Sequence, residues 1–398
     1  MNWEQKTLDQ LGYVSRGRSR HRPRDAQHLY DGPYPFIQTS DVKHANLYIT
    51  DYKQTYNEEG LAQSKLWPSG TLCITIAANI ADTAILGIDA CFPDSVIGFI
   101  PEKDKADARF IKYLFDALLQ RRFKSFTQGA AQDNLSQSKL LSIKFPVPHI
   151  NEQKRISEIL SNYDELIINN YNRISILEKS VHLLYKEWFV HLRFPGCEHA
   201  LITDGIPIGW EKVRVPDIID INPKTIVPKD QENKYVDMAA LTENSMVVSE
   251  IKSKKGNSGS KFTNGDTLFA RITPCLENGK TGYVNFLSAN ETAIGSTEFI
   301  VLRPKRVPSE FVYCLSRTYN FRENAIKSMV GSSGRQRVQV SCFDEFILLI
   351  PSARIMDMFT EIVTPIFNQI KILTIQNQKL KQARDLLVLK LINGEISI

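Results

Sequence analysis

The chain has 398 residues, 42% of them hydrophobic and 10% aromatic, which is ordinary for folded protein and enough for about two domains. Its 49 basic and 44 acidic residues leave a formal net charge of +5, which permits a polyanionic partner without identifying one. The N-terminus lacks a signal-peptide pattern, and no run of about 18 apolar residues indicates a membrane span. We therefore expect a cytoplasmic protein that does not contact membranes.

The six cysteines are scattered, and no two lie within three residues of each other. This spacing excludes a C-x-x-C metal or redox pair, and we expect reduced, mostly buried thiols. His191, Cys197 and His199 form a local cluster of soft ligands, but no second pair completes a zinc site. We expect no metal in this chain.

The sequence contains an internal repeat with a period of about 200 residues. Trp3-Glu4 recurs as Trp210-Glu211, segment 70–74 resembles 265–269, and segment 109–114 resembles 310–315. Each copy begins with short β-rich segments separated by Gly, Pro, Asn and Asp, and ends in one long helical pattern. We expect strands at 72–76, 96–100, 268–272 and 299–302, and short helices near 107–120 and 308–322.

The two helical patterns have apolar residues at alternating steps of three and four, which is typical of a coiled-coil seam. The first follows Asn151, a candidate N-cap, and the second contains Pro365, so the second helix either begins near this proline or is kinked there. The first seam is Leu160, Tyr163, Ile167, Asn170, Ile174, Leu177, Val181, Leu184 and Trp188. The second seam is Val363, Ile366, Ile370, Leu373, Asn377, Leu380, Arg384, Leu387 and Leu391.

Two seams in one chain most simply pair with each other. We predict an α+β fold in which two similar β-rich domains are separated by two long helices that form an antiparallel coiled coil with pseudo-two-fold symmetry. The expected divisions are a first domain at 1–150, a first helix at 151–193, a linker and second domain at 194–351, and a second helix at 352–398. Asn170 and Asn377 are predicted to form a hydrogen bond across the helix pair and to fix its register.

The junction between the copies carries motifs of a known family. Segment 146–156 reads Pro-Val-Pro-His-Ile-Asn-Glu-Gln-Lys-Arg-Ile, and segments 188–190, 193–196 and 207–210 read Trp-Phe-Val, Arg-Phe-Pro-Gly and Pro-Ile-Gly-Trp. Segments 261–272, 277–280 and 391–395 add to the match. On these residues, and over essentially its whole length, the chain resembles the specificity (S) subunit of type I restriction-modification systems. It departs from the pattern at 352–355, which lacks the Glu-Gln pair of the first copy.

The resemblance implies a sequence-specific DNA-binding protein with two target-recognition domains, each of which reads one half of a bipartite site. The helix pair would set the unread spacer and dock two methyltransferase (M) subunits, and restriction or motor (R) subunits would join the complex. S-adenosylmethionine, ATP and Mg are then expected on those partners, with no cofactor and no catalytic site in this chain. A prokaryotic, cytoplasmic location and double-stranded DNA as the ligand follow from the same resemblance.

Arginines occupy every second position near the N-terminus. Gly17, Ser19 and Pro23 disfavour a helix, and an extended chain would place all five guanidinium groups on one face, where they could follow phosphates or read guanine edges. The alternative is a solvated surface loop. The row consists of Arg16, Arg18, Arg20, Arg22 and Arg24.

Two further regions are candidates for DNA contact. Four lysines surround the Gly- and Ser-rich segment 256–260, whose glycines would let the backbone approach DNA, although an ordinary exposed loop is the alternative. A polar, Gly-containing turn also lies late in each copy, with different side chains that would suit different half-sites. The lysines are Lys252, Lys254, Lys255 and Lys261, and the turn residues are Gln132 and Asn134 in the first copy and Arg335, Gln336 and Arg337 in the second.

Two alternative functions remain open. A DNA nuclease could bind Mg²⁺ through Asp217, Glu250 and Lys252, although so short a pattern is common by chance. The chain has no Asn- or Asp-Pro-Pro-aromatic motif for a flipped base and no G-x-x-x-x-G-K-[ST] phosphate loop. The other alternative is a scaffold protein that does not bind DNA, which would show no sequence preference among random duplexes.

Overall fold

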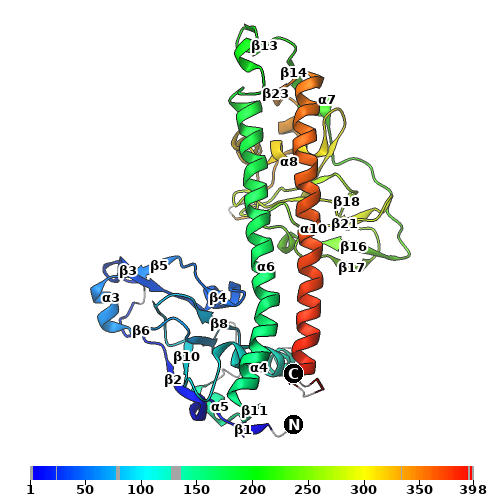
Figure 1. Ribbon diagram of the computed structural model, residues 1–398. Helices are drawn as coiled ribbons and strands as arrows, with labels where there is room; N and C mark the ends of the chain where they lie inside the picture. The colour runs from blue at the N-terminus through cyan, green and yellow to red at the C-terminus, as the bar shows by residue number, and fades with distance from the viewer. Residues whose placement is uncertain are drawn as a thin grey trace. The chain divides into compact units, whose positions relative to one another are not determined.

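The computed structural model describes residues 3–23, 25–77, 81–126, 136–332, 334–392 and 395–396, without the side chains of 119–126. The chain forms two compact units (Figure 1). Unit 1 consists of Met1–Asn169 and Asn377–Ile398, and unit 2 consists of Asn170–Gln376. Each unit combines short strands and helices with a share of both long helices, which confirms the expected α+β class.

Unit 1 is built around a central five-stranded sheet in the order β2-β10-β7-β8-β4. A four-stranded sheet, β5-β3-β9-β6, packs against one face of it, and helix α4 covers the other. Alternate side chains of strand β7 make these two contacts. Leu72 and Ile74 belong to the hydrophobic cluster that contains α4, whereas Cys73 between them belongs to the cluster of Trp67 and Phe92. Every residue of β7 is buried, as expected for a strand covered on both faces.

The elements of unit 1 lie along the chain as follows: β1 Glu4–Lys6, α1 Leu8–Leu11, β2 Gly12–Arg16, η1 Gln27–Leu29, β3 Tyr30–Phe36, α2 Thr39–His44, β4 Tyr48–Ile49, β5 Gln54–Tyr56, α3 Glu58–Gln63, β6 Leu66–Trp67, β7 Leu72–Thr75, β8 Thr83–Leu86, β9 Ala90–Cys91, β10 Val96–Pro101, α4 Ala108–Phe126, α5 Gln137–Ser142 and β11 Phe145–Val147. Strand β1 pairs with β11.

Unit 2 repeats this plan with sheets β15-β22-β19-β20 and β17-β16-β21-β18, and with β14 paired to β23. Its elements are η2 Lys186–Val190, η3 Cys197–His199, β12 Ile202–Thr203, β13 Ile206–Pro207, β14 Glu211–Arg214, α7 Val215–Ile218, β15 Ile219–Ile221, β16 Glu232–Val236, η4 Met238–Ala240, β17 Lys252–Lys255, β18 Ser260–Phe262, β19 Thr267–Ala270, β20 Thr281–Tyr283, β21 Ala293–Gly295, β22 Phe299–Pro304, α8 Ser309–Ser316, α9 Tyr319–Lys327, η5 Val340–Phe343 and β23 Ile347–Ile350.

The strand orders establish that the internal repeat is a repeat of fold. Without the extra edge strand β4, the order β2-β10-β7-β8 matches β15-β22-β19-β20, and β5-β3-β9-β6 matches β17-β16-β21-β18. The four strands expected from the sequence are present as β7, β10, β19 and β22, and the expected short helices as α4, α8 and α9. The prediction of two similar β-rich domains is therefore confirmed.

The long helices α6 (Ile150–Tyr185) and α10 (Ala353–Ile392) each run through both units. Within each unit their segments lie side by side and run in opposite directions (Figure 1). None of the residues of the two expected seams is exposed. The alternation of three and four therefore identified the paired faces, as expected for an antiparallel coiled coil.

Two details of the helix ends differ from the sequence prediction. Helix α6 begins at Ile150, so Asn151 lies inside the first turn, and the carbonyl of His149 accepts from the amides at 152 and 153. Helix α10 begins at Ala353 and continues through Pro365, so it does not start at the proline. The proline has no amide hydrogen for the carbonyl of Glu361, but both residues are exposed, and water can hydrate that carbonyl.

A buried ion pair joins the two helices within unit 1. Arg384 on α10 donates through Nη1 to Asp164 on α6, and the Tyr113 hydroxyl on α4 donates to the other carboxylate oxygen at 2.5 Å. The Asp164 side chain is 2% exposed. Burial raises the pKa of Tyr113, so the phenol keeps the proton that it donates. These three groups hold α4, α6 and α10 together.

Polar contacts also attach both helices to the globular part of unit 2. The Glu178 carboxylate on α6 accepts from Ser245 Oγ at 2.7 Å and from the Met246 amide at 2.8 Å. On α10, the Thr364 hydroxyl donates to Glu310 of α8 at 3.0 Å. Burial raises the pKa of Glu178, and the hydrogen bonds from the two donors partly offset this rise in pKa.

Replacing Arg384 by methionine is expected to lower the free energy of unfolding by about 3 kcal/mol, because the Asp164 carboxylate stays buried without its cation. Urea unfolding of the full chain, followed by circular dichroism, measures the change. Arg354→Met is the matched control, since this arginine is exposed in the first turn of the same helix, and it should cost less than about 0.5 kcal/mol. Equal losses for the two variants would contradict a structural role for the ion pair.

Candidate functional site

A row of exposed arginines follows the edge strand β2 in unit 1. Arg16, Arg18 and Arg20 are exposed, while Gly17 and Ser19 between them are buried. The chain therefore continues in the alternating conformation that the sequence predicted, with three guanidinium groups toward solvent. Among the described residues, none of these three has an ion-pair partner within 4.0 Å.

The row ends earlier than predicted. The Arg22 guanidinium turns back and donates to the carbonyls of Ser19 at 2.7 Å and His21 at 2.8 Å, and it lies 4.0 Å from Asp94. An arginine fork seeks nearby acceptors, and here the acceptors are backbone carbonyls of its own segment. Arg24 lies outside the described residues.

Backbone hydrogen bonds fasten the arginine row to the domain. The amide of Gly17 donates to the carbonyl of Val96, and that of Arg18 donates to Phe92. A Cβ on Gly17 would lie 2.3 Å from the Phe92 carbonyl oxygen, so only glycine allows this close approach. The Gln63 side chain accepts from the amide of Arg20 at 2.6 Å.

Lys65 extends this surface, although the sequence pattern did not single it out. Its ammonium lies 3.8 Å from the centre of the Trp67 ring and 4.4 Å from that of Tyr13, and it donates to the Tyr13 hydroxyl at 3.2 Å. The Tyr13 side chain is 52% exposed. We define the arginine surface as Arg16, Arg18, Arg20, Lys65 and Tyr13.

The same edge of unit 2 carries different side chains. Gly12 pairs with Pro101 in unit 1, and Ile219 pairs with Pro304 in unit 2. When the count from these pairs is continued past the ends of the strands, Arg16 aligns with Pro223 and Arg18 with Thr225. The β6 and β18 pairings likewise match Lys65 to Ser260. The two units therefore present different chemistry at one structural position.

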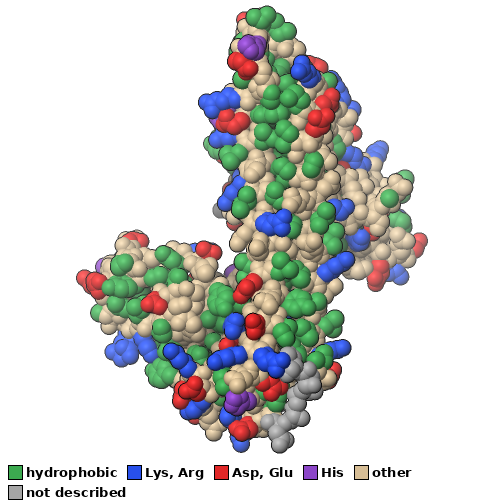
Figure 2. Space-filling model, in the orientation of Figure 1, with side chains coloured by type: hydrophobic (Ala, Val, Ile, Leu, Met, Phe, Trp, Pro, Cys, Tyr) green, Lys and Arg blue, Asp and Glu red, His purple; other side chains and the backbone are tan. Residues whose placement is uncertain are grey.

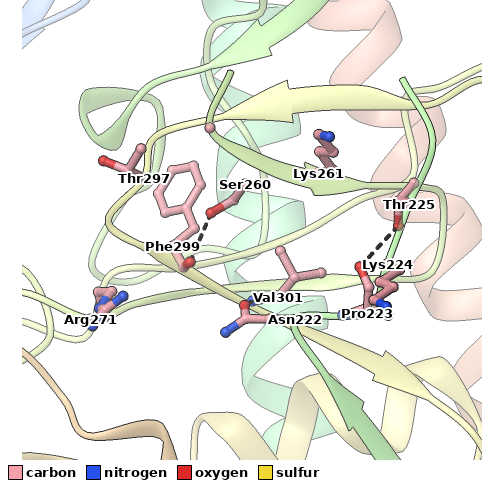
Figure 3. A pocket seen from close by; sticks show the side chains of 11 residues that line it. Asn222, Pro223, Lys224, Thr225, Ser260, Lys261, Arg271, Thr297, Phe299 and Val301 are labelled. Carbon is pink, nitrogen blue, oxygen red and sulfur yellow. Dashed lines mark hydrogen bonds between the residues drawn. The ribbon is translucent and has the colours of Figure 1, made fainter. Parts of the chain in front are cut away.

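This edge of unit 2 is hollowed into a pocket of about 500 Å³ (Figure 3). Lys224 and Arg271 lie at opposite ends of the pocket, with Phe299 and Val301 between them, and Lys261 belongs to the strand beside it (Figure 3). No carboxylate lines the pocket among the described residues. Three cations, several hydroxyl and amide groups and one aromatic ring make it suited to an anionic, hydrogen-bonding ligand.

The four lysines predicted for the second copy do not form one group. Lys252, Lys254 and Lys255 belong to β17, whereas Lys261 belongs to β18 on the opposite edge of the same sheet. Lys252 forms a 2.6 Å ion pair with Asp237, whose hydrogen bond raises the pKa of Lys252, and Lys254 lies 4.6 Å from the centre of the Tyr235 ring. Only Lys261 lines the pocket.

The Gly-rich segment between these lysines also differs from its sequence interpretation. At Gly259, φ is +106° and an added Cβ would lie 2.0 Å from the carbonyl oxygen of Gly295, so this glycine serves packing within the domain. At Gly256, φ is +100° and the space around an added Cβ is open. Only Gly256 is placed as the sequence prediction requires, where another molecule could approach the backbone.

The late turn of unit 2 lies beside the pocket. The Val338 amide donates to the carbonyl of Arg271, and the Gln336 amide donates to Thr273 Oγ1 at 3.0 Å. Arg335 is exposed, whereas the Arg337 guanidinium holds Glu298 through Nε at 3.0 Å and Nη2 at 2.7 Å. Arg337 lowers the pKa of that carboxyl, so Glu298 is ionised. We define the turn surface as Arg335, Gln336, Arg337 and Glu298.

The predicted roles of four further residues stay predictions. Gln132 and Asn134 lie outside the described residues. Asn170 and Asn377 are buried at 2% and 3% exposure, and Asn377 donates to the carbonyl of Ile167 at 3.3 Å. Their hydrogen bond to each other stays a prediction.

Elsewhere on the described surface, charges of both signs occur together. On the face shown in Figure 2, basic and acidic side chains are interspersed. Within the described part of the chain, no three His, Cys, Asp or Glu side chains are grouped to hold a metal ion, and no helix has the length and apolar character to span a membrane. Asp217, from the nuclease alternative, accepts from the Arg214 amide and thereby caps helix α7.

Known proteins resemble the chain along nearly its full length. The family model for the type I restriction modification DNA specificity domain matches residues 1–179 and 207–382. The specificity subunit of type I restriction enzyme MjaIX from Methanocaldococcus jannaschii is 25% identical over 420 residues, which cover 100% of this chain and 94% of that protein. The EcoAI specificity subunit from Escherichia coli is 31% identical over 170 residues, covering 40% of this chain and 29% of that protein.

A solved structure supports the same fold. The crystal structure of the S subunit of a type I restriction-modification system from M. genitalium aligns with a TM-score of 0.57. The alignment covers 98% of this chain and 96% of the other at 15% sequence identity.

Gly17→Ala is expected to destabilise unit 1 by about 1–3 kcal/mol, because the new methyl group would overlap the Phe92 carbonyl. The strand end would have to move, and the arginine row would move with it. Thermal unfolding of the full chain, together with protease sensitivity near residue 17, measures both effects. Wild-type stability and an unchanged cleavage pattern would show that this contact does not hold the row.

Proposed function

The chain belongs to the family of type I restriction modification DNA specificity domains, which recognise DNA sequence, and on that premise we propose that its two units read the two halves of a bipartite site. Unit 1 would bind through the arginine surface, and unit 2 through the pocket at the same edge together with the turn surface. The chain itself would be non-catalytic.

One observation carries this proposal: a strand order that the two units share, apart from the extra edge strand β4, presents different side chains at the corresponding edge of each unit. Arg16 and Arg18 can pair bidentately with guanine or follow phosphates, whereas Pro223 and Thr225 at the matching positions cannot do either in this way. A scaffold that is kept while its contact residues change is what two readers of different half-sites require. A scaffold protein that does not bind DNA has no need for this difference.

Linking two readers increases the affinity for a complete site. Once one unit has bound its half-site, the second contact is intramolecular, and two modest affinities become one tight, spacing-dependent affinity. In this proposal the paired helices set the unread spacer and also provide the docking surface for two methyltransferase subunits.

The chemistry of modification and cleavage is proposed to reside on other subunits. S-adenosylmethionine would bind the methyltransferase subunits, and ATP and Mg would bind the restriction or motor subunits that join the complex. The complete assembly would act in the cytoplasm of a prokaryotic cell. Cleavage of DNA by the isolated chain with Mg²⁺ would instead favour the nuclease alternative.

Replacing Arg335 by alanine is expected to weaken binding to the specific site by about 1–3 kcal/mol, and binding to random DNA by much less, because this exposed arginine can pair with a base edge. The target is first selected from a random duplex pool with the full chain and the methyltransferase subunits of its own locus. Fluorescence anisotropy then gives both dissociation constants.

Arg354→Ala is the control for this experiment, since it removes an exposed arginine from helix α10, outside the turn surface. Equal weakening of specific and random binding by Arg335→Ala would assign Arg335 to backbone positioning. Selection that yields no preferred sequence would favour the scaffold alternative and overturn the proposed function.

A further inference from the structure

Glu298 and Arg337 form a two-point contact on the turn surface. The Arg337 Nε donates to both carboxylate oxygens at 3.0 Å, and Nη2 donates to Oε1 at 2.7 Å. The Arg337 side chain is 45% exposed and that of Glu298 is 22% exposed. The fork that could read the O6 and N7 acceptors of a guanine is therefore occupied by a carboxylate, which also offers two acceptor atoms.

The scaffold does not require an acid at this position. In unit 2 the Arg271 amide donates to the carbonyl of Glu298, and in unit 1 the Ile76 amide donates to the carbonyl of Ser95. Ser95 is therefore the counterpart of Glu298, and the same backbone contact forms without a carboxylate. The acid is specific to the unit whose turn carries Arg335 and Arg337.

Glu298 also opposes DNA by its charge. A carboxylate at a DNA-facing surface repels phosphates, yet among the described residues the cations that lower its pKa are Arg337 and, less strongly, Arg271. An exposed ion pair favours the closed state by a factor of up to about five in the equilibrium constant. A bidentate arginine–guanine contact favours the correct base over the wrong one by a factor of about five to 150 in affinity. The carboxylate can therefore compete with a screened phosphate contact for Arg337, but it yields to a correctly placed guanine.

We propose that Glu298 is a competing ligand for Arg337, which holds this side chain away from the DNA backbone until a matching base pair displaces the carboxylate, and which thereby weakens binding to random DNA. On random DNA the ion pair stays closed, and Arg337 contributes no phosphate contact. On the correct half-site the guanine edge replaces the carboxylate. This inference rests on the proposed function of unit 2 and adds a residue that acts against non-specific binding.

The test is Glu298→Gln in the full chain, with anisotropy on the selected duplex and on a random duplex over a range of salt concentrations. Gln has the same size but cannot hold the guanidinium by charge. Random-duplex affinity should rise about fivefold, and its salt slope should steepen by about 0.9, because Arg337 gains a phosphate contact. Affinity for the selected duplex should also rise, by up to about fivefold and with no change in salt slope, because the guanine no longer has to displace a carboxylate.

Glu211→Gln is the matched control. It also removes one negative charge from unit 2, and Glu211 pairs with Arg306 at 3.5 Å, with side chains 57% and 49% exposed. It should change random-duplex affinity by less than about twofold. A second variant, Glu298→Ser, supplies the unit 1 residue and should behave like Glu298→Gln.

The outcomes separate this inference from the proposed function. If the wild-type chain has a preferred sequence and both Glu298 variants keep the wild-type affinity and salt slope on the random duplex, the inference is overturned and the proposed function stands. If both variants bind the two duplexes equally more weakly than the wild-type chain does, Glu298 supports the turn and does not compete for Arg337, which also overturns the inference. If the wild-type chain shows no preferred sequence, the proposed function itself fails.

Discussion

The ion pair between Asp164 and Arg384 is the contact on which unit 1 depends. A seam made of apolar residues alone would tolerate a slip of one heptad, because every slipped pair would still be apolar. A slip at Asp164 would leave a carboxylate buried beside carbon atoms, which is strongly destabilising. The Tyr113 hydroxyl joins the same carboxylate to α4, so the register of the helices and the seating of the domain are fixed together.

The two units show how one scaffold carries two surfaces. The buried strands keep their order and their apolar residues, because both faces of the central sheets are covered. At the edge that follows β2, Arg16 and Arg18 are exposed, whereas Pro223 and Thr225 at the matching positions after β15 are half-buried. Thr225 Oγ1 accepts from Arg303 Nη2 at 3.0 Å, so the two edges differ in how their side chains are held as well as in charge. The pocket of unit 2 and the arginine surface of unit 1 are two versions of one exposed edge.

The sequence predicted those features whose signal is local. Helix periodicity identified both seams, and the alternation from Arg16 to Arg20 was correct because Gly17 and Ser19 are small enough to be buried. It did not single out Lys65, which lies at the arginine surface of unit 1. It also did not single out Lys224 and Arg271 at the pocket of unit 2, or Glu298 at the turn surface. Contacts between segments far apart in the chain bring these residues to their surfaces. It also grouped Lys261 with the lysines of β17, because the order β17-β16-β21-β18 includes a parallel pair that no local pattern reveals.

The repeat is imperfect where the helices pair, and this has a consequence for assembly. Leu160 and Val363 begin the two seams. When the two helices are aligned on these residues, Asp164 matches Phe367 and Val181 matches Arg384. Phe367 and Val181 are buried in the core of unit 2. At these matched positions, therefore, unit 1 has a pair of charged residues and unit 2 has apolar ones. A pair of first helices would place Asp164 against valine, and a pair of second helices would place Arg384 against phenylalanine. Each would bury an unpaired charge, so the charge pair favours the union of unlike helices within one chain.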